Sequence, residues 1–159
     1  MGMADTPRVS IRLSRDEAWD FVAASHTGIF TTLRRDGVPI AMPVWFVALD
    51  SRIYMQTRGK KLLRIANDPR SSFLVESGDR WVELEAVHLT GRARVLTADS
   101  ALVDGVVEAM DRKYSAYRTD RTAMPDETRV AYTESAGGIV EFVPDDRILS
   151  WDNSRLGLA

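Results

Sequence analysis

The feature that most constrains the fold is a pair of β-strand segments joined by a tight turn. Thr27 to Leu33 is rich in Thr, Ile and Phe, which is typical of a strand. Asp36-Gly37 follows, and this dipeptide is a strong hairpin turn signal. Val38 to Leu49 is then predicted to be one long second strand. A hairpin this early favours an antiparallel all-β or α+β fold over a doubly wound parallel sheet.

The second strand of this hairpin has an unusual composition. Both of its alternating sets of residues are apolar, which predicts a strand buried on both faces. It also contains Pro39 and Pro43, which cannot donate to a strand ladder. The ladder is therefore expected to have a gap or a bulge. A flat ligand lying against the strand would use such a gap, and an edge strand at a dimer contact is the alternative.

The remaining elements follow from periodicity, caps and turn residues. Ser14 and Glu17 form a capping box that starts a helix running to about Ala24. The other predicted segments are strands over Arg52–Thr57, Ser71–Glu76, Val87–Leu96 and Gly138–Val143, helices over Lys60–Asn67 and Ser100–Tyr114, a short extended piece over Trp81–Leu84, a surface loop over Ser115–Thr128, a turn at Pro144–Asp146 and a tail over Ile148–Trp151. These segments predict a mainly β, six-stranded antiparallel barrel with peripheral helices.

Length and charge limit the domain organisation and the class of protein. The chain has 159 residues, which fits one domain over residues 13–152 between a flexible segment, 1–12, and a tail, 153–159. The net charge of -2 argues against a nucleic-acid binder. The sequence has no cysteine and two histidines, so a metal site is not expected. No apolar run approaches the ~20 residues of a membrane helix, and a cytoplasmic protein is expected.

The turn after the third strand concentrates positive charge. Ser51 to Asn67 contains five cations and no acidic residue, and three of the cations lie at the turn around Gly59. A helix N-terminus has free N–H groups and a positive dipole end, so cations there need a negative partner. A bound phosphate would provide it. A solvated basic turn near an acidic neighbour is the alternative.

Several motifs, in this order, resemble a known family. They are the Gly28–Leu33 strand, the Asp-Gly hairpin, the Pro43–Phe46 strand, the Thr57–Lys61 turn, the Asn67–Arg70 helix end and Gly91–Ala93. Together they resemble the flavin and deazaflavin oxidoreductases of the pyridoxamine 5′-phosphate oxidase-like split-barrel superfamily. The resemblance runs from about Leu13 to Trp151.

The resemblance implies a homodimer with two cofactors at the subunit interface and a small-molecule substrate. It implies that the cofactor phosphate binds at the turn and that the ring system lies along the second strand. The corresponding residues here are Met42, Pro43, Val44, Trp45, Thr57, Arg58, Lys60 and Lys61. The cofactor carries the redox chemistry in such enzymes, so no catalytic acid–base pair is expected. Trp151 is expected either to close the site from the partner chain or to pack in the core.

Two departures from the oxidase itself make pyridoxamine phosphate an unexpected substrate. The strand Ile40–Val47 has no cation, and the chain ends without the Arg-x-His signature of that enzyme. The sequence is more similar to the branch that uses the factor-420 deazaflavin, and Arg58 and Arg64 would suit the longer anionic tail of that coenzyme. FMN is the other candidate cofactor. One alternative function is a non-catalytic carrier of a flavin-like or haem-like ligand; for haem, His88 on a polar strand face is the histidine available. The other alternative is a structural dimer.

Overall fold

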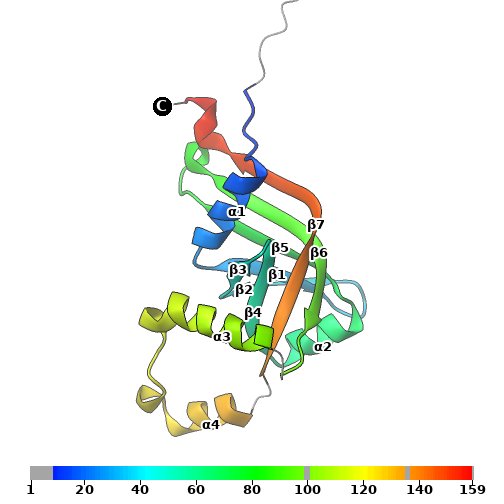
Figure 1. Cartoon of the computed structure of the whole chain (residues 1–159), viewed down its shortest axis with the longest axis vertical. Coiled ribbons are helices and arrows are strands. Elements are labelled where there is room, and N and C mark those ends of the chain that lie inside the picture. Colours follow the sequence, from blue (N-terminus) through cyan, green and yellow to red (C-terminus); the bar gives the residue numbers. More distant parts are fainter. Residues whose placement is uncertain (1–8, 99–100, 135–136, 159) are drawn as a thin grey trace, which may run out of the picture.

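The computed structural model describes residues 9–98, 101–134 and 137–158 (Figure 1). These residues form one seven-stranded antiparallel sheet in the order β2-β1-β5-β6-β7-β4-β3. The strands are β1 Gly28–Leu33, β2 Pro39–Val44, β3 Val47–Leu49, β4 Arg52–Arg58, β5 Arg70–Ser77, β6 Glu85–Val95 and β7 Gly137–Asp152. The fold is a mainly β half-barrel, as predicted, but it has seven strands and not six.

The seventh strand arises because the predicted long strand Val38–Leu49 is wrong. It is two strands, β2 and β3, separated only by Trp45 and Phe46. These two strands nevertheless form the opposite edges of the sheet. The three Cα steps from Val44 to Val47 span at most about 11 Å. The sheet must therefore curl until its edges nearly meet, and this closure shapes the half-barrel.

The prediction that this segment is buried on both faces is also wrong. β2 pairs only with β1, and four of its six residues are exposed. An edge strand tolerates Pro39 and Pro43 because it needs fewer ladder donors. β2 stays in register with β1 through both prolines, so the gap or bulge predicted from them is wrong. The pairing breaks instead at Trp45 and Phe46, and Phe46 is fully buried. Its N–H donates to the Tyr114 hydroxyl at 2.9 Å, and that hydroxyl lies 2.7 Å from its carbonyl oxygen. A side chain of the protein therefore fills this break.

The helices surround the sheet. They are α1 Arg15–Ala24, α2 Lys60–Asn67, α3 Ala101–Tyr114 and α4 Asp126–Glu134, with short 3-10 turns η1 Trp81–Glu83, η2 Ser115–Tyr117, η3 Arg121–Ala123 and η4 Asn153–Leu156. The capping box of α1 is confirmed, with Ser14 and Glu17 each accepting from the other's backbone N–H. The predicted start of the third helix at Ser100 lies outside the described residues. The loop predicted over 115–128 instead contains two 3-10 turns and the start of α4.

The last strand also differs from prediction. β7 continues through the turn predicted at Pro144–Asp146 and stays paired with β6. Between Leu89↔Ile148 and Gly91↔Pro144, β6 advances two residues while β7 advances four. The turn-like residues therefore form a bulge inside a continuous strand. The predicted extended piece at Trp81 is the 3-10 turn η1, so that prediction is wrong too.

Two groups of buried side chains hold these layers together. The larger fills the half-barrel around Phe30, Phe46, Phe73 and Phe142. The smaller lies between the β3–β4 pair and α3 and includes Tyr114. The predicted flexible segment 1–12 is described only from residue 9. There, the carbonyl of Ile11 accepts a hydrogen bond from Asp152 at 2.7 Å. The domain boundaries remain predictions. None of the helices in the described ranges has both the length and the apolarity required to cross a membrane.

Candidate functional site

The predicted strand–turn–helix is confirmed. β4 ends at Arg58, Gly59 turns the chain, and α2 begins at Lys60. Gly59 has φ +67, and a Cβ added there would meet nothing within 4 Å. The glycine is therefore required by the backbone conformation and not by lack of space. The first turn of α2 contains no acidic residue, so its free N–H groups and its cations have no local counter-charge.

A cavity of about 690 Å³ lies beside this turn, within the usual size range of small-molecule sites. It is bounded by the end of β2, the end of β4, the start of α2, α3 and the segment from η2 to α4. Six of the eight predicted cofactor residues line it, namely Pro43, Val44, Trp45, Thr57, Arg58 and Lys61. The other lining residues are Gln56, Met110, Tyr117, Arg118, Thr119, Arg121, Met124 and Tyr132. That these residues bind a cofactor remains a prediction.

The charged side chains described in this lining are all positive. Among the described residues, the lining contains four cations, from β4, α2 and the η2–η3 segment, and no carboxylate. It also contains three aromatic rings and two methionine thioethers. Such a cavity attracts anions electrostatically, and its apolar surfaces suit a flat ring system. The donor set therefore fits a planar cofactor with an anionic tail.

The indole of Trp45 forms a fixed wall of the cavity. It stacks on the ring of Tyr114 with centroids 4.6 Å apart and an interplanar angle of 2°. The Tyr114 ring is fully buried, and its hydroxyl lies 2.9 Å from the carbonyl oxygen of His26. Burial raises the pKa of this phenol, so it stays protonated as a donor at neutral pH. The His26 ring also contacts Trp45 edge-on. A wall held in this way needs little reorganisation to accept a flat ligand.

Arg58 is partly occupied by a contact within the chain. Its Nη1 donates to the carbonyl oxygen of Tyr132 at 2.7 Å, and its guanidinium lies 4.5 Å from the centre of that ring. Tyr132 belongs to the last turn of α4, where carbonyl groups carry the negative end of the helix dipole. Arg58 therefore joins the basic turn to α4. Its remaining N–H groups can still bind an anion.

Lys61 is a cavity cation with no ion-pair partner among the described residues. Its side chain is partly buried, and burial lowers the pKa of its ammonium, as does repulsion from Arg64. Both causes would be relieved by a bound anion, because an opposite charge favours the protonated form. Thr57 is buried beside it, at the end of β4. These two residues form the part of the site that best fits a phosphate.

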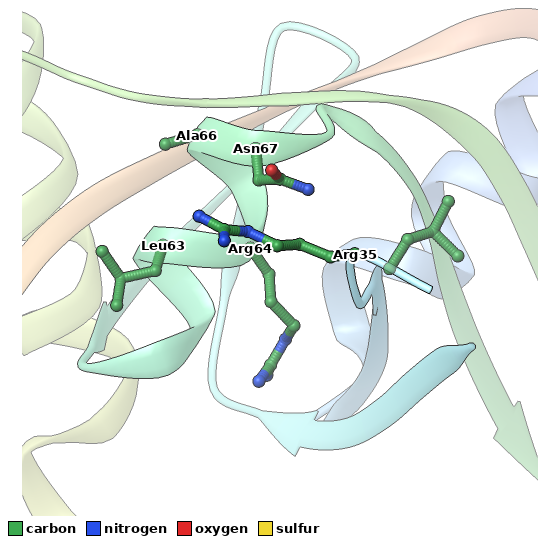
Figure 2. A pocket seen from close by; sticks show the side chains of 6 residues that line it. Arg35, Leu63, Arg64, Ala66 and Asn67 are labelled. Atoms are coloured by element: carbon green, nitrogen blue, oxygen red, sulfur yellow. The ribbon is translucent and has the colours of Figure 1, made fainter. Parts of the chain in front are cut away.

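Met42 and Lys60, the two other predicted residues, do not line this cavity. Lys60 lies on a different face of α2 from Lys61, because successive helix positions point about 100° apart. Arg64 lines another cavity together with Lys60, and Figure 2 shows its side chain on that side of α2. Its Nε donates to Thr32 at 2.8 Å, and its Nη2 lies 4.0 Å from the sulfur of Met42. The expectation that Arg64 contacts the same ligand as Lys61 is not supported by this placement.

Sequence reasoning missed the contribution of the segment after α3. Tyr117, Arg118 and Arg121 come from the stretch that was predicted to be a surface loop, and Tyr132 comes from α4. The signal was the presence of arginines and an aromatic residue in a polar stretch, but sequence alone does not show which cavity they face. Arg118 pairs with Asp111 at 2.5 Å. Within the described ranges, the Arg121 guanidinium has no hydrogen-bond partner, so it is available to a ligand.

The other aromatic and histidine candidates lie elsewhere. Trp151 pairs with Ala86 near the far end of β7, away from α3 and α4 (Figure 1). His88 lies between Leu74 and Leu149 in the sheet. Neither residue lines the cavity. Across the described residues, no three histidine or acidic side chains gather as a metal site would require.

The chain belongs to the pyridoxamine 5′-phosphate oxidase family. Residues 14–135, more than half of the sequence, match that family. No curated protein matches the sequence.

Solved structures share the fold. The conserved hypothetical protein Rv2991 from Mycobacterium tuberculosis is 30% identical, with a TM-score of 0.77 over 97% of this chain and 94% of that one. A FAD-binding protein from Mesorhizobium loti is 17% identical, with a TM-score of 0.65 over 87% and 93%. The heme storage protein HutZ from Vibrio cholerae is 12% identical, with a TM-score of 0.66 over 86% and 94%. At such low identity the last two show the fold alone.

Proposed function

We propose that this protein is an oxidoreductase that uses a bound deazaflavin of the factor-420 type, or FMN, to transfer hydride to or from a small conjugated organic molecule. The single observation that carries the proposal is the 690 Å³ cavity, which in the described part of the chain has four cations, no carboxylate and a fixed indole wall. Similarity to a FAD-binding protein supports a flavin-like ligand for this fold.

The residues of the chain bind and orient the cofactor. Lys61 and the Thr57 hydroxyl would hold a phosphate at the start of α2, where the helix dipole adds to the attraction. Trp45 and the apolar Pro43 and Val44 would support the ring system. When bound, such a cofactor supplies the hydride acceptor or donor. The protein then needs no acid–base pair of its own.

The choice of the deazaflavin over FMN rests on the number of cations. FMN has one terminal phosphate, whereas the cavity has a second group of cations, Arg118 and Arg121, on the segment after α3. A cofactor with further anionic groups along its tail would use both groups. The absence of cations on Ile40–Val47 also distinguishes this chain from the oxidase, as noted from sequence.

We further propose a homodimer. β2 is an edge strand whose Met42 side chain is 37% exposed, and Ala41 and Pro43 beside it are also exposed. An exposed apolar edge is an expected protein contact. Pro43 also lines the cavity, so a partner placed along β2 would lie next to it. Sedimentation of the purified protein tests the dimer independently of the cofactor.

Binding titrations with FMN and with a factor-420 deazaflavin test the cofactor assignment. Lys61→Glu should weaken binding by at least about tenfold, since it replaces an attraction by a repulsion at the phosphate. Lys60→Glu makes the same change in charge one residue away but outside the cavity, so it should weaken binding far less. Equal losses in the two variants would place the phosphate at the helix end itself. Unchanged affinity in Lys61→Glu would refute the site.

A non-catalytic carrier is the second candidate, because the fold is shared with a heme storage protein. A haem needs an axial ligand; the described lining contains no histidine, so Met110, Met124, Tyr117 or Tyr132 would have to provide it. Turnover separates the two functions. If the loaded protein reduces candidate acceptors no faster than the free reduced cofactor does, the carrier is favoured. Tight haem binding with a shifted absorption band would favour it as well.

A further inference from the structure

A second cationic site lies on the outer face of α2, separate from the cavity described above. Lys60, Leu63, Arg64 and Asn67 are spaced i, i+3, i+4 and i+7, so they share one helix face. Arg35 reaches across this face from the β1–β2 turn (Figure 2). We call this surface the outer α2 site. It shares no lining residue with the cavity that contains Lys61.

The outer α2 site has the size of a small-molecule site. Two adjoining cavities of about 470 Å³ and about 430 Å³ meet there and share Arg35, Leu63 and Arg64. Leu33 lines the first cavity and Ile40 lines the second. Both cavities fall within the volume range of ligand pockets. A ligand in either cavity would contact apolar surface and at least one arginine.

The charges around the outer α2 site are not balanced. Of the residues that the structure describes, four cations line the two cavities and no carboxylate does. Arg34 pairs with Asp36 at 2.7 Å. Within the described ranges, the Arg35 guanidinium and the Lys60 ammonium have no ion-pair partner. Positive charge concentrated in this way attracts an anion.

Arg64 is positioned to bind such an anion. Its Nε is fixed by the hydroxyl of Thr32, a buried residue, at 2.8 Å. This partner is neutral, so the charge of the guanidinium stays available. The remaining N–H groups keep the planar fork that suits a carboxylate. A fixed side chain loses little entropy on binding.

The apolar part of the outer α2 site indicates an organic anion rather than an inorganic one. Leu63 lies among these cations and is 71% exposed. An isolated phosphate would leave this side chain in water, whereas an aromatic or aliphatic body would cover it. We infer that the outer α2 site binds a small organic anion with a hydrophobic body and a carboxylate or similar group, at a position distinct from the proposed cofactor cavity.

A matched pair of probes tests this inference on the whole protein. Naphthalene-2-carboxylate is titrated into ¹⁵N-labelled protein, and its neutral analogue naphthalene-2-methanol is titrated in parallel. We expect saturable shifts of amide signals in residues 34–40 and 60–67 for the carboxylate, and about tenfold weaker binding of the alcohol. Equal affinity of the two probes, or no saturable shift in these residues, would overturn the inference.

Two variants and one control locate the binding. Arg35→Glu and Leu63→Ser alter exposed side chains, so both should fold, and each should weaken carboxylate binding several-fold. Arg147→Glu makes the same change in charge as Arg35→Glu at an exposed position of β7 that lines neither cavity, and it should leave binding unchanged. Equal binding by the wild type and both site variants would contradict the inference. Shifts confined to Trp45, Arg58 and Tyr117 would place the probe in the cofactor cavity instead and also overturn it.

Loss of FMN or deazaflavin binding in Lys61→Glu is a separate measurement, so the two proposals can fail independently.

Discussion

Glu141 offers the sharpest test of how the sheet holds its shape. This residue of β7 is fully buried, yet it is a carboxylate. It accepts hydrogen bonds from Arg52 at 2.7 Å, from Arg94 at 2.5 Å and from the Tyr54 hydroxyl at 3.0 Å. These partners lie on β4 and β6, the two neighbours of β7. The group therefore holds β4, which leads directly into the basic turn at Gly59.

The expected cost of losing this carboxylate follows from its surroundings. Removing one partner of a buried ion pair costs about 3–5 kcal/mol, because the other charges are left unpaired. Here the Arg52 and Arg94 side chains are 45% and 65% exposed. Water can therefore solvate them, so we expect Glu141→Leu to lower the free energy of unfolding by the lower end of this range, about 3 kcal/mol. Glu141→Gln keeps the volume and one acceptor and should cost roughly half as much, about 1.5 kcal/mol.

Urea denaturation at pH 7 measures this change in the free energy of unfolding. For a chain of this length, 3 kcal/mol corresponds to a fall in Tm of roughly 6–12 °C. The matched control is Glu108→Leu, which breaks the Glu108–Arg112 pair, where both side chains are more than 70% exposed. That variant should stay close to the wild type. A Glu141→Leu protein within about 1 kcal/mol of the wild type, or a control that loses as much, would refute the reasoning.

The same residue predicts a pH dependence with a definite sign. Burial raises the pKa of Glu141, but hydrogen bonds from Arg94, Arg52 and Tyr54 outweigh it, so the pKa lies below the usual value. A depressed carboxylate pKa stabilises the fold above the pKa of the unfolded chain, about 4.3. This contribution is lost as the pH falls through the folded pKa. The stability difference between the wild type and Glu141→Gln should therefore be full at pH 7 and shrink below about pH 4.

Three further changes have defined outcomes. Tyr114→Phe removes a buried hydroxyl that bonds the backbone of Phe46; urea denaturation should show a loss of about 1–3 kcal/mol, and an unchanged midpoint would contradict the bond. Gly91→Ala places a methyl group 2.2 Å from a backbone oxygen of β7, so the bulge must shift and the free energy of unfolding should fall by about 2 kcal/mol or more. The Arg70 guanidinium holds the pKa of Asp68 at about 2, so this pair stabilises the fold above pH 4 and its contribution is lost between pH 4 and pH 2. The Tm of Asp68→Asn should therefore fall less than the wild-type Tm over this pH range, and an identical fall would exclude the pair.

The sequence determined the elements that depend on a few neighbouring residues. The Asp-Gly hairpin, the capping box at Ser14, the turn at Gly59 and the helix after it all appear where local patterns predicted them. The physical reason is that φ preferences, helix caps and apolar periodicity depend on residues close together in the sequence. The same locality explains why most of the predicted residues reach one cavity. Six of the eight predicted residues come from just two short segments, and both segments reach the same cavity.

Only the tertiary structure decided what depends on distant partners. A continuous apolar run in the sequence does not show where a strand ends and the next one begins with a different partner. At the break between β2 and β3, the N–H of Phe46 donates to the hydroxyl of Tyr114, which lies 68 residues away in the sequence. The turn-like residues after Val143 remain inside β7 as a bulge, because the residues on both sides of them pair with β6, Pro144 with Gly91 and Ile148 with Leu89. Lys60 and Lys61 are neighbours in sequence but face different cavities, because a helix rotates each residue by about 100°. The cavity gains Arg118 and Arg121 because the chain after α3 returns to the basic turn, where Arg58 contacts Tyr132.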